Sequence, residues 1–465
     1  MFAVLAVLAL VKHWTFHTYV YDLGIFHQML WNSARGDWFA SSLKHMNYLG
    51  DHFSPSLILL APLTWLPRSA ELLLIAQAAT VVGTAHCIRA LARRELGSER
   101  GAFILGVATL LYPPLIGPIL FDLHPEPFMA LLLALGLLAL HQRRSIAAAL
   151  CFLVVLGGKE DAGLCLAPLG LVLACRRETR WFGVLLAVAA LAWSALAMLV
   201  WMPQFRPASP QGSWFYMERY SHLGSSVGDI IRFVILHPLT ALWRSASAMK
   251  GLAILVLITG FAGAFLRGGL RVLAPLPLLA AHFLSNREAQ FDLGLQYLTP
   301  LGPLLAWAAI AGAPHTILRW PRLATAIAVA TGVLAGLIPK LFPLTDYLPR
   351  PEQPVLHQAI RLVPDDASLC IPNRLGAHLS ARKDLDLCVV FEKERRQYEY
   401  YRWPDSNATY QLFDVAPSNN GIDELPSARI AALKQAGAEI LLEAQGVTLL
   451  RVDQAVLSRV ATGSR

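Results

Sequence analysis

The sequence predicts an α-helical polytopic membrane protein with a small C-terminal α/β domain, and three observations lead to that prediction. Hydrophobic residues make up 55% of the 465 residues and charged residues only 15%, whereas a soluble domain carries about 25% charged residues. The mean hydropathy is +0.49. Apolar segments recur along the chain, and most approach the roughly 20 residues that a helix needs to cross a bilayer.

About eleven spans are expected, in a transmembrane domain of residues 1–343. The first apolar segment lacks the basic start and cleavage site of a signal peptide, so we interpret it as a span. Segment 54–67 is apolar but interrupted by prolines, which favours an interfacial or re-entrant piece. The expected spans are 1–16, 70–92, 101–118, 127–141, 145–157, 161–175, 181–202, 249–266, 270–285, 295–312 and 323–342.

Arginines follow every even-numbered span, and the positive-inside rule places those loops in the cytoplasm. The protein is then expected in the inner membrane with a cytoplasmic N-terminus, and the domain 344–465 lies outside. Merging spans 145–157 and 161–175 would reverse everything downstream. Because the basic residues lie in short loops between spans, they report topology and not nucleic-acid binding. They include Arg89, Arg93, Arg94, Arg143, Arg144, Arg176, Arg177, Arg267, Arg271, Arg319 and Arg322.

Five acid-bearing motifs fall on the extracytoplasmic side in this topology. Ionisable residues at a bilayer face are costly to desolvate, so they are candidates for a functional site. Solvated loops are the alternative, and Asp22 by itself has the alternative role of a helix N-cap. The loops are short and flanked by aromatic residues and prolines, which favours a shared cavity. The motifs are Tyr21–Gln28, Gly50–Pro55, Phe121–Glu126, Gly158–Asp161 and Asn286–Tyr297.

The long loop 203–248 combines aromatic residues with an amphipathic stretch around Ile230–Trp243. Such stretches are typical of the headgroup level of a membrane. Contact with a lipid-linked or sugar substrate is the alternative interpretation.

Residues 344–465 alternate short apolar runs with helical patterns, which predicts a separate α/β domain. Expected strands are 368–371, 387–391, 410–415, 439–442 and 447–452, and expected helices are 353–362 and 427–436. This domain has no glycine-rich phosphate loop, and His378 is expected at its surface. Cys370 and Cys388 lie on strands that we expect to be neighbours, which predicts a disulfide in an oxidising compartment.

The polar motifs together resemble a bacterial family of predicted membrane proteins of unknown function that is grouped with the GT-C glycosyltransferases. The resemblance rests on Tyr21-Asp-Leu-Gly, Gly50-Asp-His-Phe-Ser-Pro, Phe121-Asp-Leu-His-Pro-Glu and Lys159-Glu-Asp-Ala-Gly. The superfamily implies a polytopic helical fold, a polyprenyl-phosphate sugar donor and a catalytic acid in the first extracytoplasmic loop. Asp22 occupies that position, although Leu23 and Gly24 replace the usual Asp-x-Asp or Glu-x-Asp form.

Glycosyl transfer from a lipid phosphate requires a carboxylate that accepts the proton of the acceptor hydroxyl. It also requires cationic groups at the phosphate leaving group. Asp22 is the candidate base, and Asp122 and Glu160 are further candidate catalytic acids. The candidate substrate-binding residues are Lys159, Arg287, Gln28, Glu288 and Tyr297, with Lys159 and Arg287 assigned to the phosphate.

A divalent metal ion is a candidate cofactor, because carboxylate and imidazole groups are its usual ligands. The candidate ligands are Asp51, His52, His124 and Glu126; a hydrogen-bonded network that fixes the loops is the alternative. The expected partners are the lipid bilayer and a polyprenyl-phosphate-linked sugar. A transporter with a broken helix at Lys159–Asp161, and a membrane assembly protein without catalytic activity, remain alternatives.

Overall fold

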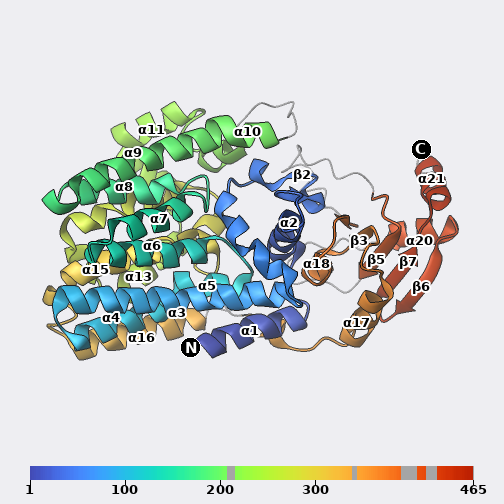
Figure 1. Cartoon of the computed structure of the whole chain (residues 1–465), viewed down its shortest axis with the longest axis horizontal. Helices are drawn as coiled ribbons and strands as arrows, with labels where there is room; N and C mark the ends of the chain where they lie inside the picture. The colour runs from blue at the N-terminus through green and yellow to red at the C-terminus, as the bar shows by residue number, and fades with distance from the viewer. Residues whose placement is uncertain (207–214, 338–342, 389–405, 415–426, 464–465) are drawn as a thin grey trace.

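The computed structural model describes residues 1–206, 215–337, 343–388, 406–414 and 427–463. A helical bundle lies at one end and a β-sheet lies at the other (Figure 1). Residues 15–68, which we call the first polar loop, lie between them. The bundle helices are α1 (Phe2–Trp14), α3 (Ser69–Leu96), α4 (Glu99–Leu110), α5 (Pro113–Phe121), α6 (Glu126–His141), α7 (Ser145–Leu156), α8 (Gly163–Ala174), α9 (Arg180–Leu196), α13 (Ala248–Gly260), α14 (Leu276–Leu284), α15 (Leu301–Gly312) and α16 (Pro321–Gly336).

The prediction of eleven continuous spans is not confirmed. Among the described residues, three helical stretches are long and apolar enough to cross a membrane: Ser69–Leu96, Glu99–Phe121 and Arg177–Phe205. A fourth exists if the bent pair Pro238–Ser245 and Ala248–Gly260, which meets at 107°, is counted as one. The other apolar helices are shorter, because turns and 3-10 segments interrupt the apolar runs. The run 270–285, for example, divides into a 3-10 segment at Gly269–Leu273 and α14.

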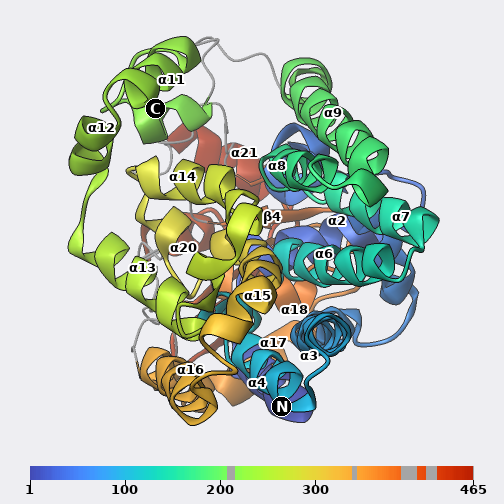
Figure 2. The same ribbon diagram turned by 90° about the vertical axis from the view of Figure 1, so that its left-hand side faces the viewer.

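Small residues allow the bundle helices to approach closely. A Cβ added to Gly170 in α8 would lie 2.6 Å from the backbone of Ala187, and one added to Gly183 in α9 would lie 2.4 Å from that of Ala174. Contacts of this kind are typical of membrane helix pairs. Helix α15 is the central helix, lying against α3, α4 and α6 (Figure 2). Almost all of its residues are buried, as expected for a helix that is apolar on every side.

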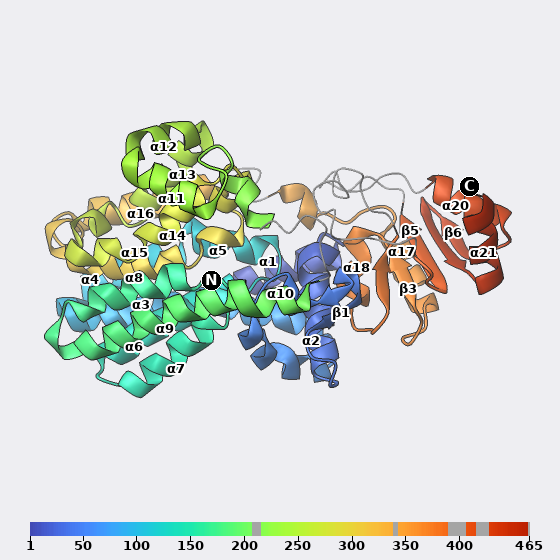
Figure 3. The same cartoon turned by 90° about the horizontal axis from the view of Figure 1, so that it is seen from above.

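The first polar loop folds into short elements between the bundle and the sheet. It contains the π-helical turn η1 (Val20–Gly24), α2 (Ile25–Ser33), the strand pair β1 (Ala40–Ser41) and β2 (Met46–Asn47), and the 3-10 helix η4 (Pro55–Trp65). Pro62, inside η4, disfavours a regular α-helix there, because it lacks the backbone N–H donor. The loop between α10 (Met202–Phe205) and α13 contains η7 (Phe215–Tyr220), α11 (Val227–Leu236) and α12 (Pro238–Ser245), which lie at one edge of the bundle (Figure 3).

The C-terminal sheet has five strands in the order β4-β3-β5-β7-β6. Its parallel half pairs β3 with β4 and β5, and its antiparallel half pairs β7 with β5 and β6. Both predicted helices and four of the five predicted strands agree closely with these elements, whereas the predicted strand 387–391 overlaps β4 only at Leu387, and α18 and α21 were not predicted. The part of strand 387–391 beyond Cys388 lies outside the described residues. The elements are α17 (Gln353–Leu362), β3 (Leu369–Ile371), α18 (Gly376–Leu379), β4 (Leu385–Leu387), β5 (Tyr410–Asp414), α20 (Ser427–Gln435), β6 (Glu439–Ala444), β7 (Val447–Arg451) and α21 (Gln454–Gly463).

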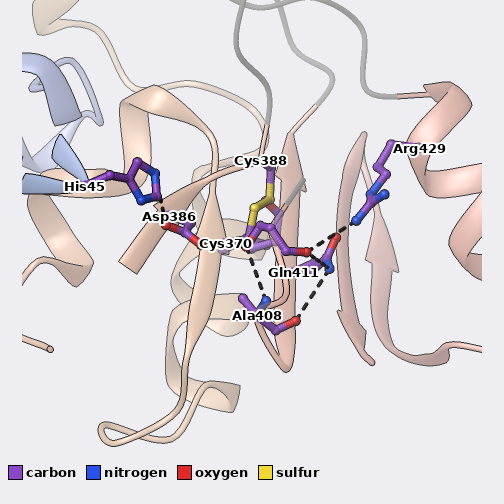
Figure 4. The surroundings of a disulfide bond; sticks show 9 residues. His45, Cys370, Asp386, Cys388, Ala408, Gln411 and Arg429 are labelled. Atoms are coloured by element: carbon purple, nitrogen blue, oxygen red, sulfur yellow. Dashed lines mark hydrogen bonds and ion pairs between the residues drawn. A yellow bond between two sulfur atoms is a disulfide. The ribbon is translucent and has the colours of Figure 1, made fainter. Parts of the chain in front are cut away.

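The predicted disulfide is present. Cys370 in β3 is bonded to Cys388, which directly follows β4, and their Cα atoms are 5.0 Å apart (Figure 4). The parallel pairing of β3 and β4 brings the two residues together. On the same side of the sheet, Asp386 lies 3.6 Å from the His45 imidazole of the first polar loop.

The prediction that His378 lies at the surface is wrong. Its ring stacks on that of His13 from α1 at 4.0 Å between centroids, and its Nε2 lies 2.9 Å from the His13 carbonyl oxygen. Nearby, the Asn373 side chain accepts a hydrogen bond from the backbone of Val20. A sequence cannot indicate such contacts, because the two partners are more than three hundred residues apart.

Candidate functional site

A cavity of about 150 Å³ lies where three of the five polar motifs meet: Gly50–Pro55, Gly158–Asp161 and Asn286–Tyr297. The first polar loop contributes His52, and the turn between α7 and α8 contributes Lys159, Glu160 and Asp161. The remaining wall comes from the start of α8, the π-helical turn Ala197–Trp201 after α9, η7, α14 and the segment after it: Leu164, Met198, Arg219, Tyr220, Ala281, His282, Gln290 and Tyr297. Segments distant in sequence therefore meet around one polar space.

Lys159 is held in this cavity by Glu126, the first residue of α6. Its Nζ lies 2.6 Å from Glu126 Oε1, and the two side chains are only 9% and 3% exposed. The ammonium also lies 4.8 Å from the centre of the Tyr297 ring. Burial alone would lower the pKa of Lys159, but Glu126 and the neighbouring acids outweigh it and hold the pKa above its usual value. Lys159 is therefore a permanent cation.

Glu160 faces the first polar loop. Its Oε1 lies 3.0 Å from His52 Nδ1, and its Oε2 accepts a hydrogen bond of 3.1 Å from the Phe53 backbone N–H. Burial raises the pKa of Glu160, but His52 and then Lys159 lower it by more than burial raises it, so that the pKa is about 2. Glu160 is therefore a carboxylate whose two oxygens are both engaged in fixing the loop.

Asp22, in the turn η1, pairs with His124. Its Oδ1 lies 2.9 Å from His124 Nε2, while His124 Nδ1 lies 3.3 Å from the Asp122 carbonyl oxygen. Acceptors at both nitrogens require that both carry a proton. Burial lowers the pKa of His124, but Asp22 raises it more, so the net pKa is above its usual value. Asp22 is therefore one partner of an ion pair and not a helix N-cap; the cap positions of η1 and α2 are Tyr19 and Gly24.

Asp122 is 1% exposed and binds backbone groups. Its Oδ2 accepts from the Tyr19 N–H at 3.0 Å and its Oδ1 from the Leu123 N–H at 2.8 Å. Burial, followed by the nearby Asp22 charge, raises the pKa of Asp122 to about 7. These contacts attach the first polar loop to the turn between α5 and α6, and Asp122 does not line the cavity.

The four candidate metal ligands do not form one ligand set. Asp51 pairs with Lys44 at 2.7 Å, and the other three pair with Glu160, Asp22 and Lys159 as described above. Across the described ranges, no group of three or more His, Cys, Asp or Glu side chains is arranged to hold a metal ion. The hydrogen-bonded network, the alternative interpretation of these residues, fits the observed geometry.

The remaining candidate substrate-binding residues separate into two groups. Tyr297 lines the cavity, whereas Gln28, Arg287 and Glu288 do not. Gln28 is completely buried, and its amide nitrogen contacts the carbonyl oxygens of Arg382 and Lys383, so it joins the first polar loop to the sheet domain. Glu288 is the exposed first residue of the short 3-10 helix Glu288–Phe291, and Arg287 directly precedes that helix.

Sequence reasoning did not assign an individual site role to Asp161 or to four other polar residues of the cavity. Arg219 and Tyr220 belong to η7, in the long loop that we interpreted as a membrane-interface segment. His282 lies inside an apolar helix, and Gln290 lies in the short helix that follows it. The buried atoms His282 Nδ1 and Gln290 Oε1 lack a well-formed hydrogen bond among the described residues. An isolated polar residue in an apolar run was the only signal for His282.

The helical bundle with its long apolar helices, the polar cavity and the appended sheet domain together define a mainly helical membrane protein. The chain belongs to the family described as "Predicted membrane protein (DUF2079)", which matches residues 12–413. The structure is similar to the crystal structure of ArnT from Cupriavidus metallidurans in the apo state, with a TM-score of 0.53 and 13% sequence identity over 98% of both chains. ArnT is a GT-C glycosyltransferase, and at this identity the likeness concerns the fold. No curated protein matches the sequence.

Proposed function

We propose that this protein is a membrane glycosyltransferase that moves a sugar from a polyprenyl-phosphate donor to an acceptor on the extracytoplasmic side. The observation that supports this most directly is the cavity, in which Lys159 and Arg219 lie beside the apolar residues Leu164 and Met198. A lipid phosphate needs both kinds of surface, since its head is anionic and its chain is apolar. The GT-C-like fold is consistent with the same activity.

In the proposed complex, the phosphate of the donor lies near Lys159 and Arg219. Preorganised cations stabilise the charge that develops on a leaving phosphate oxygen, and they act strongly where water is excluded. Arginine suits a phosphate because its guanidinium can donate two parallel hydrogen bonds, whereas lysine acts as a point charge. Leu164, which is 37% exposed on α8, marks the side of the cavity from which the polyprenyl chain would extend into the bilayer.

The proposal includes the predicted topology of about eleven spans, with a cytoplasmic N-terminus and the sheet domain outside. Local thinning of the bilayer would accommodate the helices that are shorter than its hydrocarbon core. The proposed step uses no metal ion, because Asp51, His52, His124 and Glu126 do not form one ligand set in the described structure.

The test uses the purified full chain in proteoliposomes. Binding of polyprenyl phosphate itself is measured first, and then transfer of label from a panel of radiolabelled polyprenyl-phosphate sugars to cell-envelope acceptors. We expect binding and transfer, both weakened in Arg219→Ala and unchanged in the control Glu178→Gln, an exposed residue of the 3-10 helix Arg177–Thr179 that precedes α9. Failure to bind polyprenyl phosphate would refute the proposal. Binding and transmembrane movement of the donor without transfer would favour the transporter alternative.

A further inference from the structure

One carboxylate in the cavity differs from all the others. Asp161 lines the cavity, and within the described residues its side chain makes neither a hydrogen bond nor an ion pair. It stands at the end of the turn that follows α7, and its backbone carbonyl accepts from the Leu164 N–H at the start of α8. The backbone of Asp161 is therefore fixed, while its side chain lines the cavity without a hydrogen-bond or ion-pair partner among the described residues.

The other acids of this region are engaged. Both oxygens of Glu160 are bonded, to His52 and to the Phe53 backbone. Glu126 is occupied by Lys159 and does not line the cavity. Asp22 binds His124 and Asp122 binds two backbone N–H groups, and neither lines the cavity. Asp161 is thus the one carboxylate on the described cavity wall that is available to a ligand.

The charges around Asp161 explain why it remains unpaired. Lys159 is paired with Glu126, and His52 is paired with Glu160. Burial raises the pKa of Asp161, Glu160 and Glu126 raise it further, and Lys159 and His52 oppose this, with a net pKa above its usual value. A general base works best when its pKa approaches the ambient pH. The groups that face Asp161 are Lys159, Glu160, Glu126, His52, Cys165, Arg219 and Tyr220.

We propose that Asp161, and not Asp22, is the general base that accepts the proton of the acceptor hydroxyl. This assignment rests on the proposed glycosyl transfer. The acceptor oxygen forms a bond to the anomeric carbon of the sugar as its proton passes to the Asp161 carboxylate. The bond from that carbon to the phosphate oxygen breaks, and its electron pair leaves with polyprenyl phosphate beside Lys159 and Arg219. Asp161 then releases the proton to water.

In this assignment Asp22 is a positioning residue. Its ion pair with His124 connects η1 to the turn before α6, whose first residue, Glu126, holds Lys159. Charges of alternating sign therefore run from Asp22 through His124, Glu126 and Lys159 to the cavity. Asp22 thus fixes the position of the turn before α6, and with it the position of Glu126, which binds Lys159. Asp161 contacts the acceptor.

The experiment compares Asp161→Asn, Asp161→Glu and Asp22→Asn in the reconstituted full chain, with Glu178→Gln as a control. General-base loss typically lowers a rate about 10²- to 10⁴-fold. For Asp161→Asn we expect a kcat reduction in this range, little change in the donor KM, and loss of the acidic limb of the pH profile of kcat. Asp161→Glu should restore part of the rate. Asp22→Asn should retain the acidic limb even where its rate is lower.

The outcomes separate this assignment from the proposed function. Near-normal kcat in Asp161→Asn, or loss of the acidic limb in Asp22→Asn but not in Asp161→Asn, would refute the role of Asp161 while leaving the glycosyltransferase intact. A higher KM with unchanged kcat would make Asp161 a binding residue and also refute it. A lower melting temperature of Asp161→Asn would indicate a structural role, whereas the unpaired carboxylate predicts an equal or higher one. Absence of transfer and donor binding in the wild type would instead refute the proposed function.

Discussion

The ion pair between Lys159 and Glu126 allows a quantitative test of how the cavity is held together. The distance of 2.6 Å and the small exposed fractions, 9% and 3%, define a buried pair. Removing one partner of such a pair typically destabilises a protein by about 3–5 kcal/mol, because the other charge stays buried and uncompensated. Glu126 is especially sensitive, since its Oε2 is buried without a hydrogen-bond partner in the described part of the chain. We therefore expect Lys159→Met to lower the unfolding free energy by about 3–5 kcal/mol.

A double-mutant cycle isolates the pair. Lys159→Met, Glu126→Gln and the double variant would be unfolded reversibly in mixed micelles, with the unfolding free energy as the readout. Because the double variant leaves no uncompensated charge, we expect it to be more stable than Lys159→Met alone. Polyprenyl-phosphate binding, measured on the same variants, should stay weak in the double variant, since the cation is absent although the fold is restored.

Two results would contradict this reasoning. A coupling energy near zero would mean that the pair contributes nothing to stability, as many exposed pairs do, and that the cavity is held by packing alone. Full recovery of polyprenyl-phosphate binding in the double variant would mean that Lys159 acts only on stability. The phosphate role would then pass to Arg219.

Three further predictions concern the sheet domain and the topology. His27 is buried between Ser380 and Ser69, and burial, followed by the charge of Arg35, lowers its pKa to about 4. The unfolding free energy should therefore be highest above pH 6.5 and decrease by roughly 3 kcal/mol as the pH falls to 4, because the unfolded state binds the proton first. His27→Gln should remove this pH dependence. Replacing Cys388 by Ser should lower the stability of the sheet domain by about 3 kcal/mol, measured by denaturant unfolding with the reduced wild type as a control. A single cysteine at position 434 should react with an impermeant reagent in intact cells and one at position 177 only after lysis; the reverse would invert the topology.

The class of fold could be predicted because composition and apolar run length directly report the solvent around a chain. The strands of the sheet domain could also be predicted, since strands such as Val447–Arg451 are short apolar runs bounded by turns. The ends of the membrane helices could be predicted less accurately. Apolarity does not distinguish an α-helix from the 3-10 segment at Gly269–Leu273, because the same apolar composition is compatible with both kinds of helix. That ambiguity explains why the number of spans was predicted less well than the membrane class.

The sequence predicted several residues of the candidate site, but it did not predict which of them pair with each other. Sequence motifs identified Lys159, Glu160, His52 and Tyr297, and the structure places all four on the cavity wall. They also identified Asp22, but its pairing with a histidine 102 residues away depends on how η1 meets the turn before α6. Nothing local in a sequence shows whether a carboxylate is paired, and this property distinguishes Asp22 from Asp161.

The first polar loop connects the cavity to the sheet domain. On one side, His52 and the Phe53 backbone bind Glu160 in the cavity. On the other side, the Val20 backbone binds Asn373 and the Gln28 amide binds carbonyl oxygens of the sheet domain. Because buried hydrogen bonds fix the loop from both sides, the position of His52 depends on how the sheet domain is docked. The described part of the sheet domain carries no cavity residue, yet its docking determines the geometry of the loop that forms part of the cavity wall.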